Sequence, residues 1–269
     1  MQVIGVEDET HCILVRTTRG AFRASLLAGA DGVNSIIASL AGLLLHRQVG
    51  LALEAEVSVP ALAIQTQGSY ATFDFGALQH GYGWVFPKSD HFSVGIFRAY
   101  PDKGVGMKDT LSRFIASQPV LHDCQTLSLR GQLIPLGGLF SSLNKGRILL
   151  LGDAANLADP WLGEGIYYAI RSARIAAEEI IHFLKGNLAD LSSYTNRINL
   201  EIVSQLSYAR RFARLIYQFP RIGSQLLSKS QLMQHIIFYT IRGDLSFRQL
   251  NYTLVRQLPA ILAQTLQGG

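Results

Sequence analysis

Alternating apolar and polar positions predict β-strands in the first thirty residues. Apolar runs at residues 2–6 and 12–17 are separated by turn-forming residues, and a third run covers residues 21–30. The third run ends in a segment, Leu26 to Ala30, that we expect to be a buried strand. The pattern therefore predicts a β-meander, followed by a short helix at residues 34–42 (NSIIASLAG).

Strand-like runs also dominate residues 51–136, which we expect to form one sheet. One helix, at residues 107–117, interrupts them. The sequence PKSDH at residues 87–91 lies between two runs and is typical of a hairpin connection with proline at its edge.

Residues 163–185 have the spacing of an amphipathic helix, and residues 147–151 before them predict a buried strand. A cation and a glycine at 185–186 are typical of a helix end. From residue 190 onward the pattern is helical, with breaks near Pro220 and Gly243. The apolar face that we expect on the 163–185 helix consists of Ile166, Ala169, Ile170, Ala173, Ala177, Ile180, Ile181 and Leu184.

Composition bounds the class of protein. The 269 residues are 48% hydrophobic and 16% charged, enough for one large domain or two modest ones. Cys12 and Cys124 are far apart in sequence and have no metal-type spacing, so we expect no disulfide framework and no metal site. This cysteine usage fits a cytoplasmic location.

Positive charge is concentrated in the last third of the chain. Residues 1–185 hold 15 Lys/Arg and 16 Asp/Glu, a net charge of −1, whereas residues 186–269 hold 9 and 3, a net charge of +6. Arg210, Arg211 and Arg214 are a cluster within this part. They could form a solvated helix face or attract an anionic partner, such as phospholipid or a diphosphate. No nucleic-acid-binding motif is present, so we expect no nucleic-acid partner.

Two strand-to-helix turns carry candidate chemistry. In LLLGDAANLADPWLGEGIYYA, a strand delivers Asp153 to the carboxyl edge of a sheet, where a carboxylate can accept hydrogen bonds from a ribitol chain. Gly163 and Gly165 then allow a ring to approach the backbone, and the following helix start favours an anionic edge such as that of a reduced flavin. The earlier GADGVNS repeats the arrangement with Asp31 and Gly32.

The ordered pair of motifs resembles those of flavin-dependent oxidoreductases related to aromatic-ring hydroxylases. Between them, YGWVFPK at residues 82–88 resembles the Y-x-W-x-F-P-K motif of the geranylgeranyl reductase family. The resemblance covers about residues 1–185. It implies an FAD-dependent reduction of C=C bonds in an isoprenoid chain, in lipid or chlorophyll biosynthesis, with NAD(P)H or another electron donor.

The implied fold class is α/β: a partial Rossmann-like FAD-binding domain at 1–48 and 138–186, an inserted β-sheet substrate domain at 49–137 and a helical C-terminal region at 187–269. The resemblance assigns flavin binding to Asp31, Gly32, Gly152, Asp153, Ala154, Pro160, Gly163, Gly165 and Ile166. It assigns substrate contact to Tyr82, Trp84, Phe86, Pro87 and Lys88.

Tyr82, Trp84 and Phe86 alternate along a strand and therefore share one face. They could form the wall of a pocket for an isoprenoid chain, or ordinary sheet core. We interpret Glu164 as a favourable acid in the first turn of a helix rather than as part of a proton relay, and we assign no catalytic residue.

The glycine-rich turn G-x-G-x-x-G, which normally holds the ADP half of FAD, is not found in this sequence. We therefore expect a truncated chain that binds FAD poorly by itself. Two other functions stay open: a flavin-dependent monooxygenase or halogenase, and a non-enzymatic protein that binds prenyl lipids. A basic C-terminus would suit a prenyl-lipid substrate and peripheral membrane contact.

Overall fold

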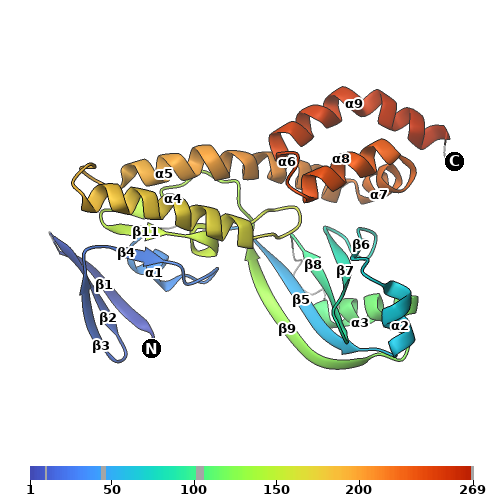
Figure 1. The fold of residues 1–269 in the computed structure, drawn as a ribbon, viewed down its shortest axis with the longest axis horizontal. Coiled ribbons are helices and arrows are strands. Elements are labelled where there is room, and N and C mark those ends of the chain that lie inside the picture. The colour runs from blue at the N-terminus through green and yellow to red at the C-terminus, as the bar shows by residue number, and fades with distance from the viewer. Residues whose placement is uncertain (10, 44–46, 101–105, 268–269) are drawn as a thin grey trace. The chain divides into compact units, whose positions relative to one another are not determined.

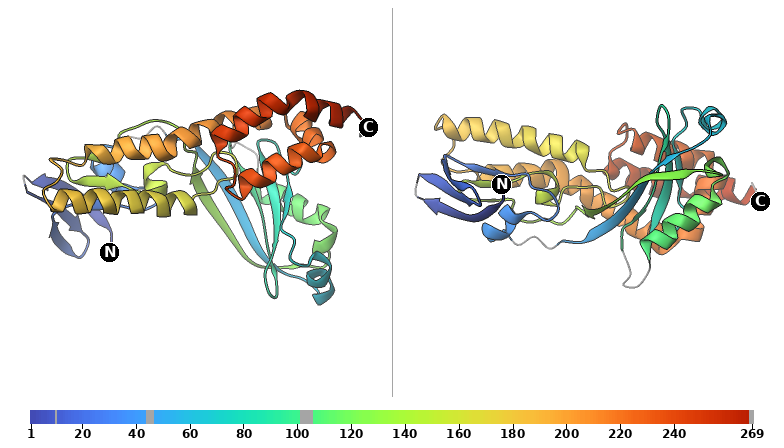
Figure 2. Two further views of the ribbon diagram at one scale, coloured as in Figure 1. Left: turned by 45° about the horizontal axis from the view of Figure 1, so that its top comes forward. Right: turned by 90° about the horizontal axis from the view of Figure 1, so that it is seen from below.

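The computed structural model describes residues 1–9, 11–43, 47–100 and 106–267 (Figure 1). Contacts divide the chain into two compact units, seen from further sides in Figure 2. Unit 1 comprises residues 1–48 and 135–210, and unit 2 comprises residues 49–134 and 211–269. The sequence led us to treat 187–269 as one region, whereas this division falls at Arg210, inside helix α6 (Ser204–Gln218).

Unit 1 contains the expected meander and a small parallel sheet. Strands β1 (Val3–Glu9), β2 (Cys12–Thr17) and β3 (Gly20–Ala24) pair antiparallel in that order. The second sheet has the order β10 (Asn144–Lys145), β11 (Ile148–Leu150), β4 (Leu27–Gly29), and β11 is parallel to β4. The expected buried strand at residues 26–30 is wrong in part: β4 is an edge strand, so Ala28 and Ala30 are exposed.

Helices in unit 1 follow each strand of the parallel pair. The expected short helix is α1 (Ile36–Leu40), which Ser35 caps by accepting the Ala38 N–H at 2.9 Å. The long helix is α4 (Ile166–Leu184), and α5 (Ser192–Ile198) packs beside it (Figure 1). A π-helical segment, Asn199–Val203, continues α5 into α6.

The apolar face expected on α4 is wrong in large part. Ile166, Ile170 and Ile181 are 77%, 59% and 51% exposed. The residues of α4 that are buried include two polar ones: Tyr168, Ser172, Ile175, Ala176 and Glu179. Apolar spacing alone could not find this face, because Ser172 and Glu179 are buried through specific hydrogen bonds to other elements.

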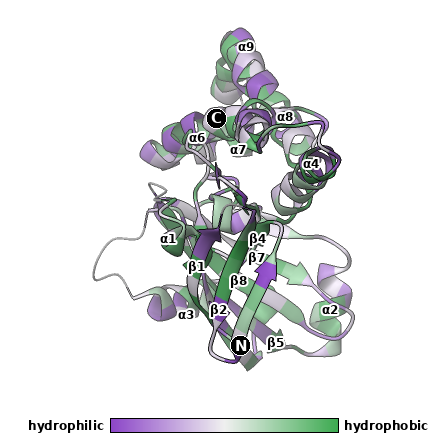
Figure 3. Ribbon diagram, turned by 90° about the vertical axis from the view of Figure 1, so that its left-hand side faces the viewer, coloured by the Kyte–Doolittle hydropathy of each residue, from purple (hydrophilic) through white to green (hydrophobic). Residues whose placement is uncertain are grey.

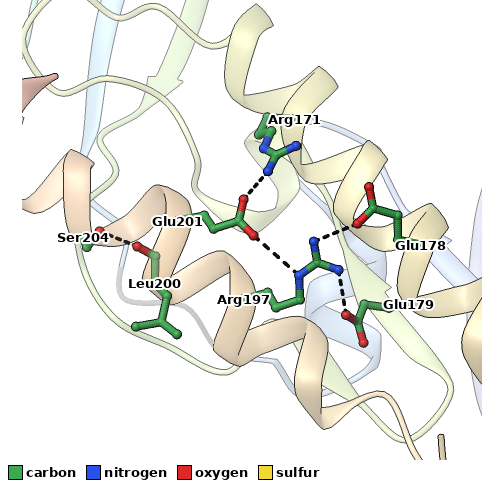
Figure 4. Close-up of polar contacts among 7 residues, drawn as sticks. All are labelled: Arg171, Glu178, Glu179, Arg197, Leu200, Glu201 and Ser204. Atoms are coloured by element: carbon green, nitrogen blue, oxygen red, sulfur yellow. Dashed lines mark hydrogen bonds and ion pairs between the residues drawn. The ribbon is translucent and has the colours of Figure 1, made fainter. Parts of the chain in front are cut away.

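Arg197 of α5 explains how Glu179 can be buried (Figure 4). Its Nη1 donates to Glu179 at 2.9 Å, its Nη2 donates to Glu178 at 2.7 Å, and its Nε lies 3.5 Å from Glu201. Arg171 of α4 also pairs with Glu201. Because a buried carboxylate needs a partner, this network fixes which side of α4 faces α5.

Unit 2 contains the expected sheet. Its strand order is β6 (Thr72–Asp74), β7 (Gly81–Pro87), β8 (Phe92–Arg98), β5 (Val49–Ser58), β9 (Gln125–Pro135). The predicted hairpin at 87–91 is confirmed, since the Lys88 N–H donates to the His91 carbonyl at 2.9 Å and β7 pairs with β8. Figure 3 shows hydrophobic colour over much of β8.

One face of this sheet packs against helix α3 (Met107–Ser117). The core there includes Leu53, Val85 and Ile96 from the strands and Leu111 and Phe114 from α3. Helix α2 (Ala61–Gln67) and a 3₁₀ turn, Pro119–Leu121, add to it. The sequence did not predict α2.

The C-terminal part of unit 2 is helical, as expected. It continues α6 and contains α7 (Pro220–Lys229), α8 (Gln231–Ile241) and α9 (Phe247–Gln267). The breaks near Pro220 and Gly243 are confirmed, and Ser230 introduces a third break, where its Oγ accepts the Met233 N–H at 3.2 Å. Across the described ranges, no helix is both long enough and apolar enough to cross a membrane.

Candidate functional site

The two aspartate–glycine motifs lie side by side in unit 1. They follow adjacent parallel strands, with Leu150 opposite Gly29 and the Leu151 N–H donating to the Gly29 carbonyl at 2.9 Å. Asp31 and Asp153 therefore leave the same carboxyl edge of the sheet, which is where α/β folds bind ligands.

The turn that carries Asp153 is held tightly against α4. Gly152 adopts a φ of +53°, and its N–H donates to Ser172 Oγ at 3.0 Å. A Cβ on Gly152 would lie 3.0 Å from the Cβ of Ala169. Glycine is thus required here by both its left-handed backbone and its close approach to the helix.

The Asp153 carboxylate is half-buried and makes no hydrogen bond with any residue in the described ranges. Burial raises its pKa above the usual value. Its Oδ1 would lie 3.1 Å from a Cβ on Gly165, so the absence of a side chain there leaves the carboxylate room. A ligand hydroxyl would supply the missing hydrogen bond.

The loop between this turn and α4 is folded around Asp159. The buried Asp159 carboxylate accepts the N–H groups of Trp161 at 2.8 Å and Leu162 at 3.1 Å. The Asp159 N–H donates to the Glu164 carbonyl at 2.8 Å, and the Gly163 N–H donates to the Asp159 carbonyl at 2.9 Å. Burial raises the pKa of Asp159 to about 7, although the two amides act to lower it. We did not predict this residue.

The start of α4 is partly capped by the chain itself. The side-chain Oε1 of Glu164 accepts the Tyr167 N–H at 2.8 Å. The expectation that Glu164 lies in the first turn of the helix is wrong by position, because Glu164 precedes the N-cap residue Gly165, although its side chain does bond an amide of that turn. Gly163 has a φ of +76°, Gly165 is the N-cap residue, and the side chain of Ile166 is exposed.

In the first motif, GADGVNS, Asp31 stabilises the start of helix α1. Its Oδ2 accepts the N–H groups of Ile36 at 2.7 Å and Ile37 at 3.1 Å, at the start of α1. Burial acts to raise the pKa of Asp31, but hydrogen bonds from the Ser35 hydroxyl and these amides outweigh it, and the pKa is lowered. Gly32 has a φ of +80° and open space around its Cα.

Arg47 joins the two motifs, and sequence patterns gave no sign of it. Its Nη1 donates to the Val33 carbonyl in the first motif, and its Nη2 donates to the Ala154 carbonyl in the second at 3.3 Å. Ala154, Gly152 and Pro160 are themselves buried, so these residues position the turn and offer a ligand little side-chain surface.

In unit 2, the predicted substrate residues form part of an aromatic surface. Trp84 pairs with Gly95 of β8, which pairs with Glu54 of β5, so these positions share the sheet face opposite α3. Among the described residues, six aromatic rings lie on this side of the sheet, and we call the surface that they form the aromatic face. Neighbouring ring centroids are 5.1 to 6.4 Å apart, from Phe73–Phe86 to Phe73–Phe75. The rings are Phe73, Phe75, Tyr82, Trp84, Phe86 and Phe97.

The sequence identified half of these rings. Phe73 and Phe97 join through strand pairing, and Phe75 joins from the turn that follows β6, neither of which spacing along one strand can reveal. Trp84 is buried across Gly95, where any Cβ would overlap the indole ring. Its Nε1 donates to Ser93 Oγ at 3.3 Å, and Ser93 donates to Glu54. Pro87 ends β7, and Lys88 is exposed in the hairpin.

Within the described ranges, no three His, Cys, Asp or Glu side chains are grouped so that they could hold a metal ion.

Together, the parallel strand pair, the two aspartate–glycine turns and the glycine-rich helix start define a nucleotide-cofactor fold. The chain belongs to the FAD-binding domain family, whose model matches residues 7–200. FAD is the cofactor of this family. The residues present fit its flavin and ribitol portion, because Asp153 offers a carboxylate that has no hydrogen bond among the described residues, and Gly165 leaves the space beside it open.

Relatives also confirm the resemblance to geranylgeranyl reductases. An uncharacterized protein of Methanosarcina barkeri is 30% identical over 249 residues, which cover 93% of this chain and 63% of the relative. The geranylgeranyl diphosphate reductase of Rhodobacter capsulatus is 42% identical over 113 residues, covering 41% of this chain and 28% of the relative. The chain thus spans less than two thirds of either relative's length.

A solved structure shows the same fold. The structure of a geranylgeranyl bacteriochlorophyll reductase-like protein from Thermoplasma acidophilum has a TM-score of 0.77 and 21% sequence identity. The match covers 99% of this chain and 69% of that one. The α/β fold class, with its FAD-binding part, β-sheet and C-terminal helices, is confirmed.

Proposed function

We propose that this chain forms the flavin-binding and substrate-binding parts of an oxidoreductase that reduces C=C bonds of an isoprenoid chain. The observation that carries the proposal is the aromatic face, built around the Tyr82–Lys88 motif in a member of an FAD-binding family. The name of the Rhodobacter capsulatus relative supports a geranylgeranyl-type substrate.

When bound, reduced FAD supplies the hydride that such a reduction requires, and NAD(P)H or another donor supplies its electrons. The chain's own part is to bind and orient. Asp153 would accept hydrogen bonds from ribitol hydroxyls, and Gly165 would leave room for the ring. Arg47 would hold the two turns at a fixed distance from each other, since it donates to a carbonyl in each. Ligand contacts of Asp31, Gly32, Gly163 and Ile166 belong to the same proposal.

The aromatic face would hold the isoprenoid chain. Phe73, Phe75 and Phe86 are only half-buried, so part of this surface is accessible to a ligand. A long apolar chain gains about 25 cal/mol per Å² of surface that it buries, and flat rings offer that area at little cost in side-chain entropy. Tyr82 and Trp84 are more deeply buried and would mainly support the outer rings.

The test is reduction of geranylgeranyl diphosphate by the purified chain with FAD and dithionite, followed by mass spectrometry. We expect products that gain H₂ for each bond reduced. Phe86→Ala should raise KM by about 10-fold with a smaller change in kcat, because it removes binding area. Phe22→Ala, at an exposed position of β3, is the control.

Two results would contradict the proposal. Products that gain an oxygen atom would indicate a monooxygenase. Tight binding of the prenyl lipid without bound flavin or turnover would indicate a lipid-binding protein.

Peripheral membrane contact is the second part of the proposal, and α9 supports it better than the arginine cluster does. Arg210 is buried, where it donates to the Gly137 carbonyl at 2.8 Å and to Leu136 and Gln48, so it is not available to a membrane. Helix α9 has Arg248 and Arg256, no acidic residue and an exposed apolar stripe. The stripe consists of Tyr252, Val255, Leu258, Leu262 and Leu266.

Sedimentation with anionic phospholipid vesicles measures this contact. We expect Val255→Ser with Leu262→Ser to release most of the bound protein, because the pair removes apolar area from the stripe. Leu127→Ser, at an exposed position of β9, is the matched control. Equal sedimentation of the α9 variant and the wild-type protein would contradict a role of α9 in membrane contact.

A further inference from the structure

A cleft lies in unit 2, beside helix α3. Its volume is about 560 Å³, within the range that binds small molecules. Its lining includes Arg98 at the end of β8 and Arg113 of α3, together with Asp74, Gln79, Thr110 and Ser117. Arg98 shares a strand face with Val94 and Ile96, which belong to the core under α3. The cleft is therefore on the opposite side of the sheet from the aromatic face.

Arg98 is buried in an unusual way for a cation. Its side chain lines the cleft although the residue is only 6% exposed. Its Nε is buried and has no hydrogen-bond partner within the described ranges. An arginine is always charged, and burying an unpaired charge is costly unless a counter-ion is present. A bound anion would remove this cost.

Arg113 provides a second cation at the same cleft. It is exposed, and within the described ranges its guanidinium makes only long hydrogen bonds of 3.4 Å, to the Asp109 carbonyl and to Thr110 Oγ1. Asp74 is the acidic residue of the lining, and its Oδ1 accepts the Gly76 N–H at 2.8 Å. Among the described residues of the lining, two guanidinium groups therefore accompany one carboxylate, which gives these residues a net positive charge.

The geometry points to this cleft as a binding site for the phosphate or diphosphate group of a small molecule, separate from the aromatic face. Guanidinium groups pair with phosphate through two parallel hydrogen bonds, and a pair of arginines suits a diphosphate. The inference goes beyond the proposed reductase and does not rest on it, because it uses residues on the other side of the sheet.

Isothermal titration of the purified chain with pyrophosphate, at constant low ionic strength, tests the site. We expect saturable binding that Arg98→Gln and Arg113→Gln each weaken by about 10-fold or more, since each removes a charge-assisted contact. Asp74→Asn should tighten binding, because it removes the opposing charge. Arg130→Gln, at an exposed position of β9, removes one positive charge elsewhere and should have no effect.

Arg113→Gln keeps the test valid if Arg98→Gln does not fold, because Arg113 is on the surface of α3. A second titration, with geranylgeranyl diphosphate, distinguishes a lipid headgroup from a free phosphate compound: tighter binding than pyrophosphate, still lost in Arg113→Gln, would identify the headgroup. Equal binding with pyrophosphate would identify the phosphate group as the whole ligand.

Three results would overturn the inference: no saturable binding, equal weakening by Arg130→Gln, or loss of pyrophosphate binding in Phe86→Ala, which would place the anion on the aromatic face. The titration needs neither FAD nor turnover. Its failure would therefore leave the reductase proposal standing, and failure of the reductase assay would leave the anion site standing.

Discussion

At the level of single residues, Arg47 links two turns that come from distant parts of the sequence. Its guanidinium donates to the Val33 carbonyl after β4 and to the Ala154 carbonyl after β11. Both carbonyls belong to turns that follow the carboxyl edge, so one side chain sets the spacing between the motifs. A positioning residue of this kind needs no direct contact with the ligand.

Arg47→Gln should lower the free energy of unfolding by about 1–3 kcal/mol, because it leaves at least one carbonyl without its charged donor. It should also weaken FAD binding, since the turns lose their common anchor. Urea unfolding and FAD titration measure the two effects. Arg19→Gln, at an exposed position between β2 and β3, is the control. Unchanged FAD affinity in Arg47→Gln would contradict a positioning role.

The sequence could find the two aspartates but could not tell them apart. Both follow an apolar strand and both are near glycine. In the structure, Asp31 accepts two amides at the start of α1, whereas the carboxylate of Asp153 is without a hydrogen bond among the described residues. The difference depends on where each helix begins relative to its aspartate. Arg47 was unpredictable because no motif surrounds it.

At the level of elements, the loop from Asn156 to Gly165 is an ordered connection, not a flexible one. Asp159 holds it through the amides of Trp161 and Leu162, and the Asp159 backbone bonds both Gly163 and Glu164. The loop therefore brings Gly165 to the side of Asp153 in a fixed conformation. Its stability depends on the protonation state of one buried carboxyl group.

That dependence predicts how stability changes with pH. The folded-state pKa of Asp159 is about 7, above the usual aspartate value of 3.8, so the folded chain binds this proton more tightly than the unfolded chain does. The stabilisation is complete below the unfolded pKa and is lost as pH rises through about 7. At most about 4 kcal/mol is involved, since one pKa unit corresponds to about 1.4 kcal/mol.

Urea unfolding between about pH 5 and about pH 8 measures this effect. We expect the wild-type free energy of unfolding to fall over that interval, and we expect a smaller fall in Asp159→Asn, which has no proton to lose. An identical pH slope in the two proteins would show that Asp159 does not titrate there.

The elements themselves were more predictable than their faces. The existence of α4 followed from apolar spacing, but the buried face did not, because Ser172 and Glu179 are buried by bonds to Gly152 and Arg197. Similarly, alternation placed Tyr82, Trp84 and Phe86 on one face, while strand pairing added the rings of Phe73 and Phe97. The turn after β6 added the ring of Phe75. The spacing of apolar residues along one element does not predict its contacts with other elements.

At the level of the whole molecule, residues on both sides of the 49–134 segment form unit 1, which contains both aspartate–glycine turns. The family resemblance led us to expect a partial FAD-binding domain at 1–48 and 138–186 with a substrate domain between, and the roles of these parts stay predictions. Poor binding of FAD by this chain alone stays a prediction.

The central claim is that unit 1 binds the flavin portion of FAD through the turn at Asp153. The most direct measurement is a titration of the purified chain with FAD, followed by its flavin absorbance spectrum after dialysis, for wild-type protein and Asp153→Ala. We predict saturable binding that is at least about 10-fold weaker in Asp153→Ala, because on our proposal the carboxylate would accept charge-assisted hydrogen bonds from the ligand. Equal affinity in the two proteins, or no saturable binding by the wild-type chain, would contradict the claim.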